Sequence, residues 1–191
     1  MDGMGAHYKP ILEQAKDIVR SKMQPELDKM LLMAVFKGDA EQIGRSIKGG
    51  ANINAYSDGN TMLMYAVGWG KGESVRKLLQ EGADPNLLSY NKETALVWAV
   101  YMERSDIAKI LIEEGKGLDI DARTDGGVTA LMIACLSEKN IDIVRLLLSR
   151  GADPTLKDDK GIGTSVYASN NKEALELIND AIRKRLGFRG E

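Results

Sequence analysis

The stretch TMLMYAVGWGKGESVRKLLQEGADPN, residues 61–86, contains two predicted helices and a turn. TMLMYAV predicts a short helix, and the glycine-rich run 68–72 interrupts it. ESVRKLLQEG predicts a second helix, because its apolar residues share one stripe and Gly82 stands at its C-terminal end. The segment therefore indicates a helix-loop-helix unit.

This unit recurs along the chain at nearly constant spacing. EGADPN at 81–86 returns as SRGADP at 149–154, and more loosely as KGGANIN at 48–54. A second marker is an alanine, often five residues after a threonine, that recurs every 32 to 35 residues: Ala34, Ala66, Ala99, Ala134 and Ala168. A period near 33 residues is typical of stacked repeats. The sequence thus predicts an all-α solenoid.

The links between the units are rich in turn-forming residues. GADPNLLSYNKET, residues 82–94, places Gly, Asp, Pro and Asn in turn positions. We expect each link to project as a β-turn finger. Thr61, Thr94 and Thr129 each precede a predicted helix, so their hydroxyls are expected to cap its first turn.

These units resemble ankyrin repeats, a family with T-P-L-H-x-A and G-A-D-x-N signatures at the same spacing. The matching residues are Thr61, Leu63 and Ala66; Thr94, Leu96 and Ala99; Thr129, Leu131 and Ala134; and the GAD runs at Gly82 and Gly151. The resemblance covers roughly residues 26–186. It implies an ankyrin-repeat-like solenoid of helix-loop-helix units with β-turn fingers.

The chain departs from the family's pattern at defined positions. The family's proline is Met62, Ala95 and Ala130 here, and its histidine is Met64, Val97 and Met132. The threonine-to-histidine hydrogen bond of the family is therefore absent from these units. Lys92 stands where the finger usually has glycine, which implies either a left-handed lysine or a changed turn type.

The repeat spacing divides the chain into one solenoid domain with an extra N-terminal helix. The predicted boundaries are 1–25 for an N-terminal capping helix, 26–57, 58–89, 90–124 and 125–158 for repeats 1 to 4, and 159–191 for a C-terminal capping repeat.

Both ends of the chain are expected to cap the stack. Residues 8–23 predict a helix with one apolar stripe, which we interpret as a lid on the first repeat; a dimerisation or partner helix is the alternative. Gln24 is then a weak cap, and Pro25 begins the first repeat's opening helix. The last helix ends in a basic cluster, which favours a solvated helix end over a docking patch: Arg183, Lys184 and Arg185.

Composition argues against several classes of partner. Twenty-six Lys and Arg against twenty-eight Asp and Glu give a net charge of −2, which offers no bulk attraction to nucleic acid or anionic membranes. No stretch approaches eighteen apolar residues, and the N-terminus lacks a secretory pattern. One cysteine, Cys135, fits a reducing compartment. We expect a cytoplasmic monomer with no nucleic-acid or membrane partner.

The sequence predicts no catalytic, cofactor-binding or metal-binding residues. The single histidine, His7, has no cysteine or carboxylate partner at a metal-site or nucleophile spacing. Cys135 lies in the apolar run ALMIACL and is expected to be a buried packing thiol. The glycine-rich run 68–72 lacks a phosphate-loop spacing. Two aspartate pairs, 119 with 121 and 158 with 159, fall in finger turns, where Asp forms local hydrogen bonds.

A partner is expected on the concave side, the usual binding surface of the family that this chain resembles. Two and three residues after the repeated alanines, the candidates are Phe36, Lys37, Trp69, Tyr101, Met102, Leu136 and Ser137. The finger candidates are Tyr56, Tyr90 and Arg123. Tyr65, Trp98 and Tyr167 precede the alanines and are expected to be partly buried. Large apolar residues on an exposed stripe suit protein recognition.

The sequence therefore favours a non-enzymatic protein-protein interaction module, an adaptor or an inhibitor. The partner is expected to be a protein or a peptide. The alternative is a self-associating structural or scaffold protein that uses its N-terminal helix. No cofactor is expected.

Overall fold

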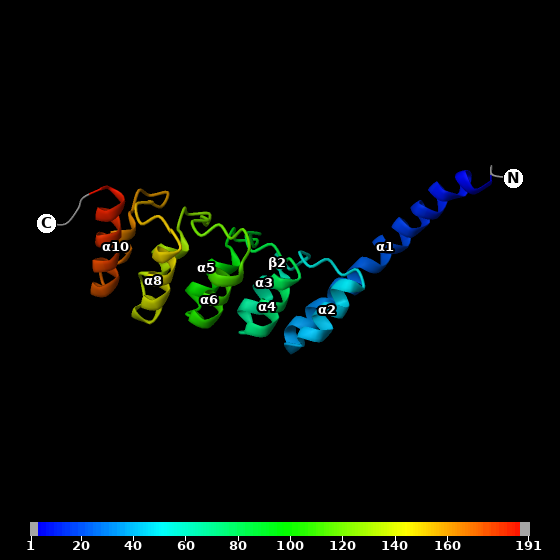
Figure 1. The fold of residues 1–191 in the computed structure, drawn as a ribbon, viewed down its shortest axis with the longest axis horizontal. Helices are drawn as coiled ribbons and strands as arrows, with labels where there is room; N and C mark the ends of the chain where they lie inside the picture. The colour runs from blue at the N-terminus through cyan, green and yellow to red at the C-terminus, as the bar shows by residue number, and fades with distance from the viewer. Residues whose placement is uncertain (1–3, 188–191) are drawn as a thin grey trace.

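A computed structural model describes residues 4–187, with side chains from residue 21 onward. Within these residues, pairs of antiparallel helices stack into an elongated all-α solenoid (Figure 1). The first, inner helices of the pairs are α1 (Met4–Lys37), α3 (Met62–Gly68), α5 (Ala95–Tyr101), α7 (Ala130–Ala134) and α9 (Thr164–Tyr167). The second, outer helices are α2 (Ala40–Lys48), α4 (Gly72–Gln80), α6 (Ser105–Glu114), α8 (Ile141–Ser149) and α10 (Lys172–Arg185). A short 3₁₀ turn, η1 (Glu138–Asn140), leads into α8.

Threonine hydroxyls fix where three inner helices begin. Oγ1 of Thr61 accepts a hydrogen bond of 3.3 Å from the backbone N–H of Met64, and Thr94 and Thr129 make the equivalent bond in α5 and α7. Each bond satisfies an N–H that the first turn of a helix leaves unpaired. The predicted caps are confirmed. Gly163 replaces the threonine before α9, which has no side-chain cap.

The core is a continuous apolar layer between the inner and outer helices. The repeated alanines lie inside it with at most 2% of their surface exposed. In the middle of the stack, α3 packs against α1, α4 and α5, and α4 packs against α2 and α6. Each repeat is therefore stabilised mainly by its neighbours, as expected for a solenoid.

The fingers are tight turns that require left-handed backbone. The first is a two-stranded hairpin, β1 (Tyr56–Ser57) and β2 (Asn60–Thr61), in which Ser57 pairs with Asn60. Asp58 and Gly59 between the strands both have positive φ, 45° and 78°, which is the turn geometry that suits the twist of a hairpin. Lys92 holds the equivalent place to Gly59 in the second finger, with φ 56°. The left-handed lysine is thus confirmed.

The N-terminal helix differs from the prediction. Residues 8–23 do not form a separate helix, because α1 continues unbroken through Pro25 to Lys37, and Figure 1 shows its N-terminal half leading away from the repeats. Gln24 does not act as a cap. Its side-chain amide instead donates to Oδ1 of Asp28 at 2.7 Å and to the carbonyl of Gly50 at 3.1 Å. Pro25 removes one backbone hydrogen bond from α1, and the bond from Gln24 to Gly50 ties the helix to the loop that follows α2.

A chain of side-chain acceptors joins the loops that follow the outer helices. We call it the loop ladder. Three bonds connect consecutive loops: Asp84 N to Oδ1 of Asn54 (3.0 Å), Asp119 N to Oδ1 of Asn86 (2.7 Å), and Asp153 N to Oδ1 of Asp121 (2.9 Å). Because each bond satisfies a backbone donor of the next repeat, the ladder fixes the spacing of the repeats along this edge.

Candidate partner-binding surface

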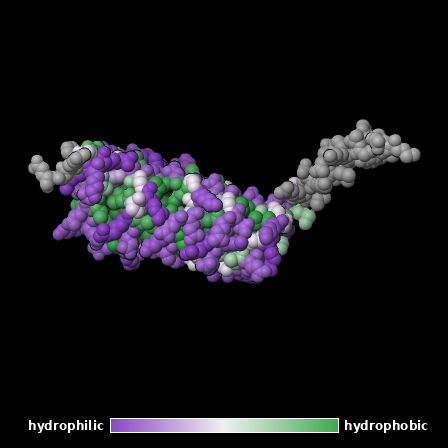
Figure 2. Space-filling model, in the orientation of Figure 1, coloured by the Kyte–Doolittle hydropathy of each residue, from purple (hydrophilic) through white to green (hydrophobic). Residues whose placement is uncertain are grey.

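The inner helices and the fingers form one side of the stack, which we call the inner surface. Four large apolar residues lie exposed at the C-terminal ends of the inner helices: Tyr101 (77%), Leu136 (62%), Phe36 (52%) and Met102 (45%). All four were predicted to face a partner. We call them the apolar row, because they occupy equivalent positions two or three residues after the alanines of repeats 1, 3 and 4. Figure 2 shows hydrophobic groups running along the stack between hydrophilic margins.

Trp69 fills the row in the second repeat but is only half-exposed. Its ring meets Phe36 edge-on, with centroids 5.1 Å apart, and stacks on Tyr65 with centroids 4.9 Å apart. The expected open stripe is therefore partly closed at this point. Aromatic pairs in these two geometries attract one another, so Phe36 is held in place by its neighbour.

Two predicted polar candidates have different surroundings. Ser137 is half-buried, and its hydroxyl donates to Glu103 at 2.8 Å. Lys139 donates to the same carboxylate at 2.6 Å, and these two bonds hold the pKa of Glu103 below its ordinary value. Lys37 is exposed at the end of α1. Ser137 is thus engaged within the chain, whereas Lys37 is open to solvent.

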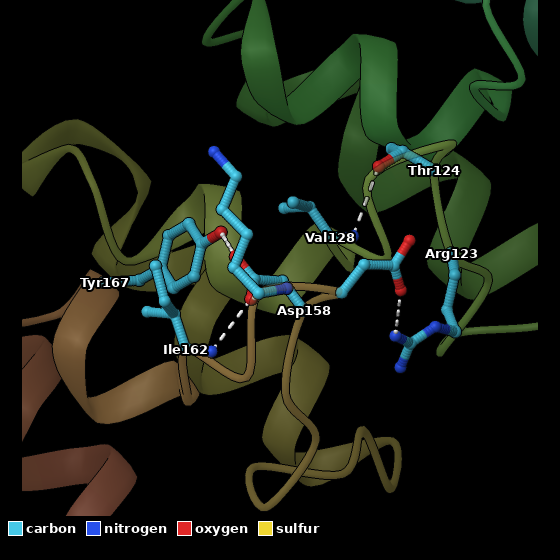
Figure 3. A network of polar contacts seen from close by, with 8 residues as sticks. Arg123, Thr124, Val128, Asp158, Ile162 and Tyr167 are labelled. Atoms are coloured by element: carbon cyan, nitrogen blue, oxygen red, sulfur yellow. Dashed lines mark hydrogen bonds and ion pairs between the residues drawn. The ribbon is translucent and has the colours of Figure 1, made fainter.

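The finger candidates lie at different degrees of exposure. Tyr90 is 87% exposed at the tip of the second finger. Tyr56 is 52% exposed, and its hydroxyl donates to the carbonyl of Leu88 at 3.0 Å. Arg123 reaches across to Asp159 of the fourth finger at 3.0 Å (Figure 3). Tyr90 is therefore the most accessible of the three.

The fingers are joined in two pairs. The backbone N–H of Tyr90 donates to the carbonyl of Gly59 at 2.7 Å, which links the first finger to the second. Asp159 N donates to the carbonyl of Gly126 at 3.0 Å, which links the third finger to the fourth. The second and third fingers are linked differently. Among the described residues, their contact is the ion pair in which Nζ of Lys92 donates to Asp125 at 2.8 Å.

In three repeats, one side chain of the inner helix ties that helix to its own finger. These residues directly precede the repeated alanines and are partly buried, as predicted. Their bonds were not predicted: Tyr65 Oη to the carbonyl of Ser57 (3.0 Å), Trp98 Nε1 to Glu93, and Tyr167 Oη to Oδ2 of Asp158 (2.7 Å). The sequence signal was present, because all three side chains carry a donor at the same repeat position.

Asp158 is the centre of the fourth finger (Figure 3). Its carboxylate accepts from the hydroxyl of Tyr167 and from the backbone N–H groups of Lys160 (2.9 Å) and Ile162 (2.8 Å). The Tyr167 bond is the main cause that holds the pKa of Asp158 below its ordinary value. Burial and the same bond raise the pKa of Tyr167 to about 12. The predicted local turn role of this aspartate is confirmed.

Sequence reasoning missed exposed apolar residues at the two ends. Val166 is 60% exposed in α9, and Met30 and Met33 are 52% and 49% exposed in α1. In the middle repeats, the positions equivalent to Val166 and Met30 are buried, and those equivalent to Met33 are partly buried. A missing neighbour cannot be read from a local pattern, since it depends on where the stack ends.

No metal-binding arrangement is found among residues whose side chains the structure describes. No group of three His, Cys, Asp or Glu side chains is placed to hold a metal ion there. Cys135 is fully buried, and burial raises the pKa of its thiol to about 12. Asp119 accepts the backbone N–H of Asp121 at 3.1 Å, a local turn bond. No helix in this part of the chain is both long and apolar enough to span a membrane.

The repeat geometry has a counterpart among known proteins. A family model of ankyrin repeats in three copies matches residues 31–124 and 72–158. The chain belongs to the ankyrin repeat family. Ankyrin repeats generally mediate protein-protein interactions and are typically not enzymatic.

The ankyrin relatives are diverse in size and source. A putative ankyrin repeat-containing protein of Treponema pallidum is 27% identical over 91% of this chain and 57% of its own length. The human transient receptor potential cation channel subfamily A member 1 is 35% identical over 63% of this chain and 11% of its own length. A putative ankyrin repeat protein of Rickettsia felis is 30% identical over 63% of this chain and 40% of its own length. The chain thus spans only part of each relative.

Proposed function

We propose that this ankyrin chain is an adaptor or inhibitor that binds a protein or peptide partner on its inner surface. The apolar row carries the proposal. Tyr101, Leu136, Phe36 and Met102 expose large apolar groups on three repeats. Aromatic and methionine side chains bury a large area with few rotatable bonds, which makes them frequent centres of binding energy.

The surroundings of the apolar row support a protein partner. The fingers carry both signs of charge, and several of these charges are already paired within the chain, such as Lys92 with Asp125 and Arg123 with Asp159. Nucleic-acid binding usually requires a surplus of unpaired basic side chains. A mixed, partly neutralised rim around an apolar centre is typical of protein interfaces instead.

The test is site-specific photo-crosslinking in the native host. A photoreactive phenylalanine analogue at position 101 is compared with the same analogue at Lys109, an exposed residue of the outer helix α6. We expect a crosslinked protein partner from position 101 and none from position 109. Equal products from both positions, or products from neither, would rule out a binding site on the inner surface.

A second measurement separates binding from folding. The pair Tyr101→Ala and Met102→Ala should lower capture of the crosslinked partner at least tenfold, because truncating a central anchor costs about 2 kcal/mol or more. Circular dichroism should show unchanged helix content, because both side chains are exposed. The matched control, Lys109→Ala, should leave capture as in the natural chain.

A further inference from the structure

The first repeat leaves uncovered a surface that every later repeat buries. Met30 lies four residues before the repeated alanine of its unit and is 52% exposed. The residues at the same position in the other four repeats are each 1% exposed: Met62, Ala95, Ala130 and Thr164. Those four are covered by the preceding repeat, and the first repeat has none before it within the described residues.

The outer helix of the first repeat repeats this pattern. Gln42 lies three residues after the N-terminal cap of α2 and is half-buried. Its equivalents in the later repeats are at most 1% exposed: Ser74, Ile107, Ile143 and Ala174. A hollow of about 440 Å³ lies between α1 and the start of α2, and Met30, Met33 and Gln42 line it. We call this surface, with Glu26 and Lys37 at its two ends, the open face.

Two charges on the open face, Glu26 and Lys37, are arranged for a second copy of the same surface; Lys29 and Asp39 also line the hollow. Glu26, Met30, Met33 and Lys37 follow one another at spacings of four, three and four residues, so they share one side of α1. Glu26 lies four residues before the first methionine, and Lys37 lies four residues after the second. When a second copy of this strip runs in the opposite direction, methionines face methionines, and the acid of each copy faces the base of the other.

We propose that the open face binds the open face of a second chain, forming a two-fold dimer in which the two α1 helices are antiparallel. Met30 of each copy then meets Met33 of the other, and Glu26 of each copy meets Lys37 of the other. A parallel arrangement would instead place like charges opposite one another. Two-fold symmetry requires such a self-complementary surface. Methionine adapts readily to an apolar contact of this kind.

This dimer revises the expectation of a monomer and goes beyond the proposed partner site. It uses the end of the stack, whereas the apolar row lies along its side. We expect a contact between two helix faces to bury less than the roughly 1,200 Å² of a standard interface. The dimer is therefore in equilibrium with the single chain. The apolar stripe predicted for residues 8–23 lies outside the described side chains, and its role stays a prediction.

Sedimentation equilibrium of the full chain tests the proposal. The mass should rise from 20.9 kDa toward twice that value as the protein concentration increases. Glu26→Lys and Lys37→Glu each place two pairs of like charges in the dimer and should weaken association about tenfold or more. An equimolar mixture of the two variants should associate again, because each then supplies the charge that the other lacks. The double variant should also recover.

The controls distinguish this arrangement from other uses of the open face. Glu73→Lys, a similar charge change on the exposed side of α4, should leave the mass profile as in the natural chain. Helix content should be the same in all variants. A mass of one chain at every concentration overturns the proposal, as does association of both single variants equal to that of the natural chain. Neither result bears on crosslinking at position 101.

Discussion

The hydroxyl of Tyr167 donates a hydrogen bond of 2.7 Å to Oδ2 of Asp158, which fastens the last inner helix to the fourth finger. Tyr65 and Trp98 make the corresponding bond in the second and third repeats, whereas Ile133 has no donor in the fourth. Three of the four fingers are thus held to their own helix by one side chain.

Replacing Tyr167 by phenylalanine should destabilise the fourth finger. The ring still packs, but Asp158 loses one of its hydrogen bonds, which corresponds to about 1 kcal/mol of unfolding free energy. Urea unfolding followed by circular dichroism at pH 7 measures this loss. Tyr101→Phe is the matched control, because that hydroxyl is exposed on the same surface. Equal stability of both variants would show that the bond contributes nothing.

The same variant should alter the response to acid. The Tyr167 bond keeps the pKa of Asp158 below its ordinary value, so the folded chain binds this proton less readily than the unfolded chain. The resulting stability is present above the ordinary pKa of about 3.9 and is lost as the pH falls through the lower folded value. Tyr167→Phe should therefore lose less stability than the natural chain between about pH 4 and pH 2. Parallel urea curves at these pH values measure the difference, and identical acid losses would contradict it.

Asp121→Asn should stabilise the chain at neutral pH. Burial raises the pKa of Asp121, so its charged form is disfavoured in the fold and its stability contribution falls as the pH rises through the folded value. Asparagine keeps the oxygen that accepts the N–H of Asp153 in the loop ladder. The gain should be less than about 1 kcal/mol, because the side chain is partly exposed to solvent. The gain should vanish below the ordinary pKa of the aspartate. Thermal unfolding should therefore show a more stable variant at pH 7 and equal stability of the two chains at pH 3.5.

Lys92→Gly should also stabilise the chain. Left-handed backbone costs a residue with a Cβ atom about 1 kcal/mol, and glycine avoids that cost. The change removes the exposed ion pair with Asp125, which contributes less than about 1 kcal/mol. Lys92→Ala loses the ion pair without relieving the backbone, so it should be less stable than the natural chain. Thermal unfolding of the two variants in parallel measures the difference. Equal unfolding temperatures of Lys92→Ala and Lys92→Gly would contradict this account.

The thiol of Cys135 should be unreactive until the chain unfolds. It is fully buried, and its pKa of about 12 leaves little thiolate at pH 8. A colorimetric thiol reagent should react slowly with the native chain and rapidly in urea. The reference is an exposed thiol, Ser169→Cys in a Cys135→Ala background, which should react at once in the native chain.

The repeat pattern alone was enough to predict most of the fold. The alanine spacing located the helix pairs, the threonines gave the starts of the inner helices, and Lys92 marked the left-handed turn. The helix boundary predicted at residue 25 was wrong, because a proline and a weak cap suggested that a new helix begins there. The contact of Gln24 with the carbonyl of Gly50 depends on the packed loop of the first repeat, which no local pattern reveals.

The sequence predicted where the candidate residues lie within the repeats better than it predicted how exposed they are. Tyr101, Met102 and Leu136 lie exposed where the repeat spacing placed them, whereas Trp69 is half-covered. The spacing shows which residues point away from the helix pair. It does not show which neighbours reach over them, and the aromatic contacts of Trp69 come from both its own repeat and the one before.

The pairing of the fingers divides the inner surface into two halves. Backbone hydrogen bonds make the first and second fingers one unit and the third and fourth another, while an exposed ion pair between Lys92 and Asp125 spans the boundary. An exposed ion pair weakens in salt, whereas backbone bonds hardly respond to it. Raising the ionic strength should therefore weaken the contact between the second and third fingers first, while the loop ladder still joins the repeats behind them.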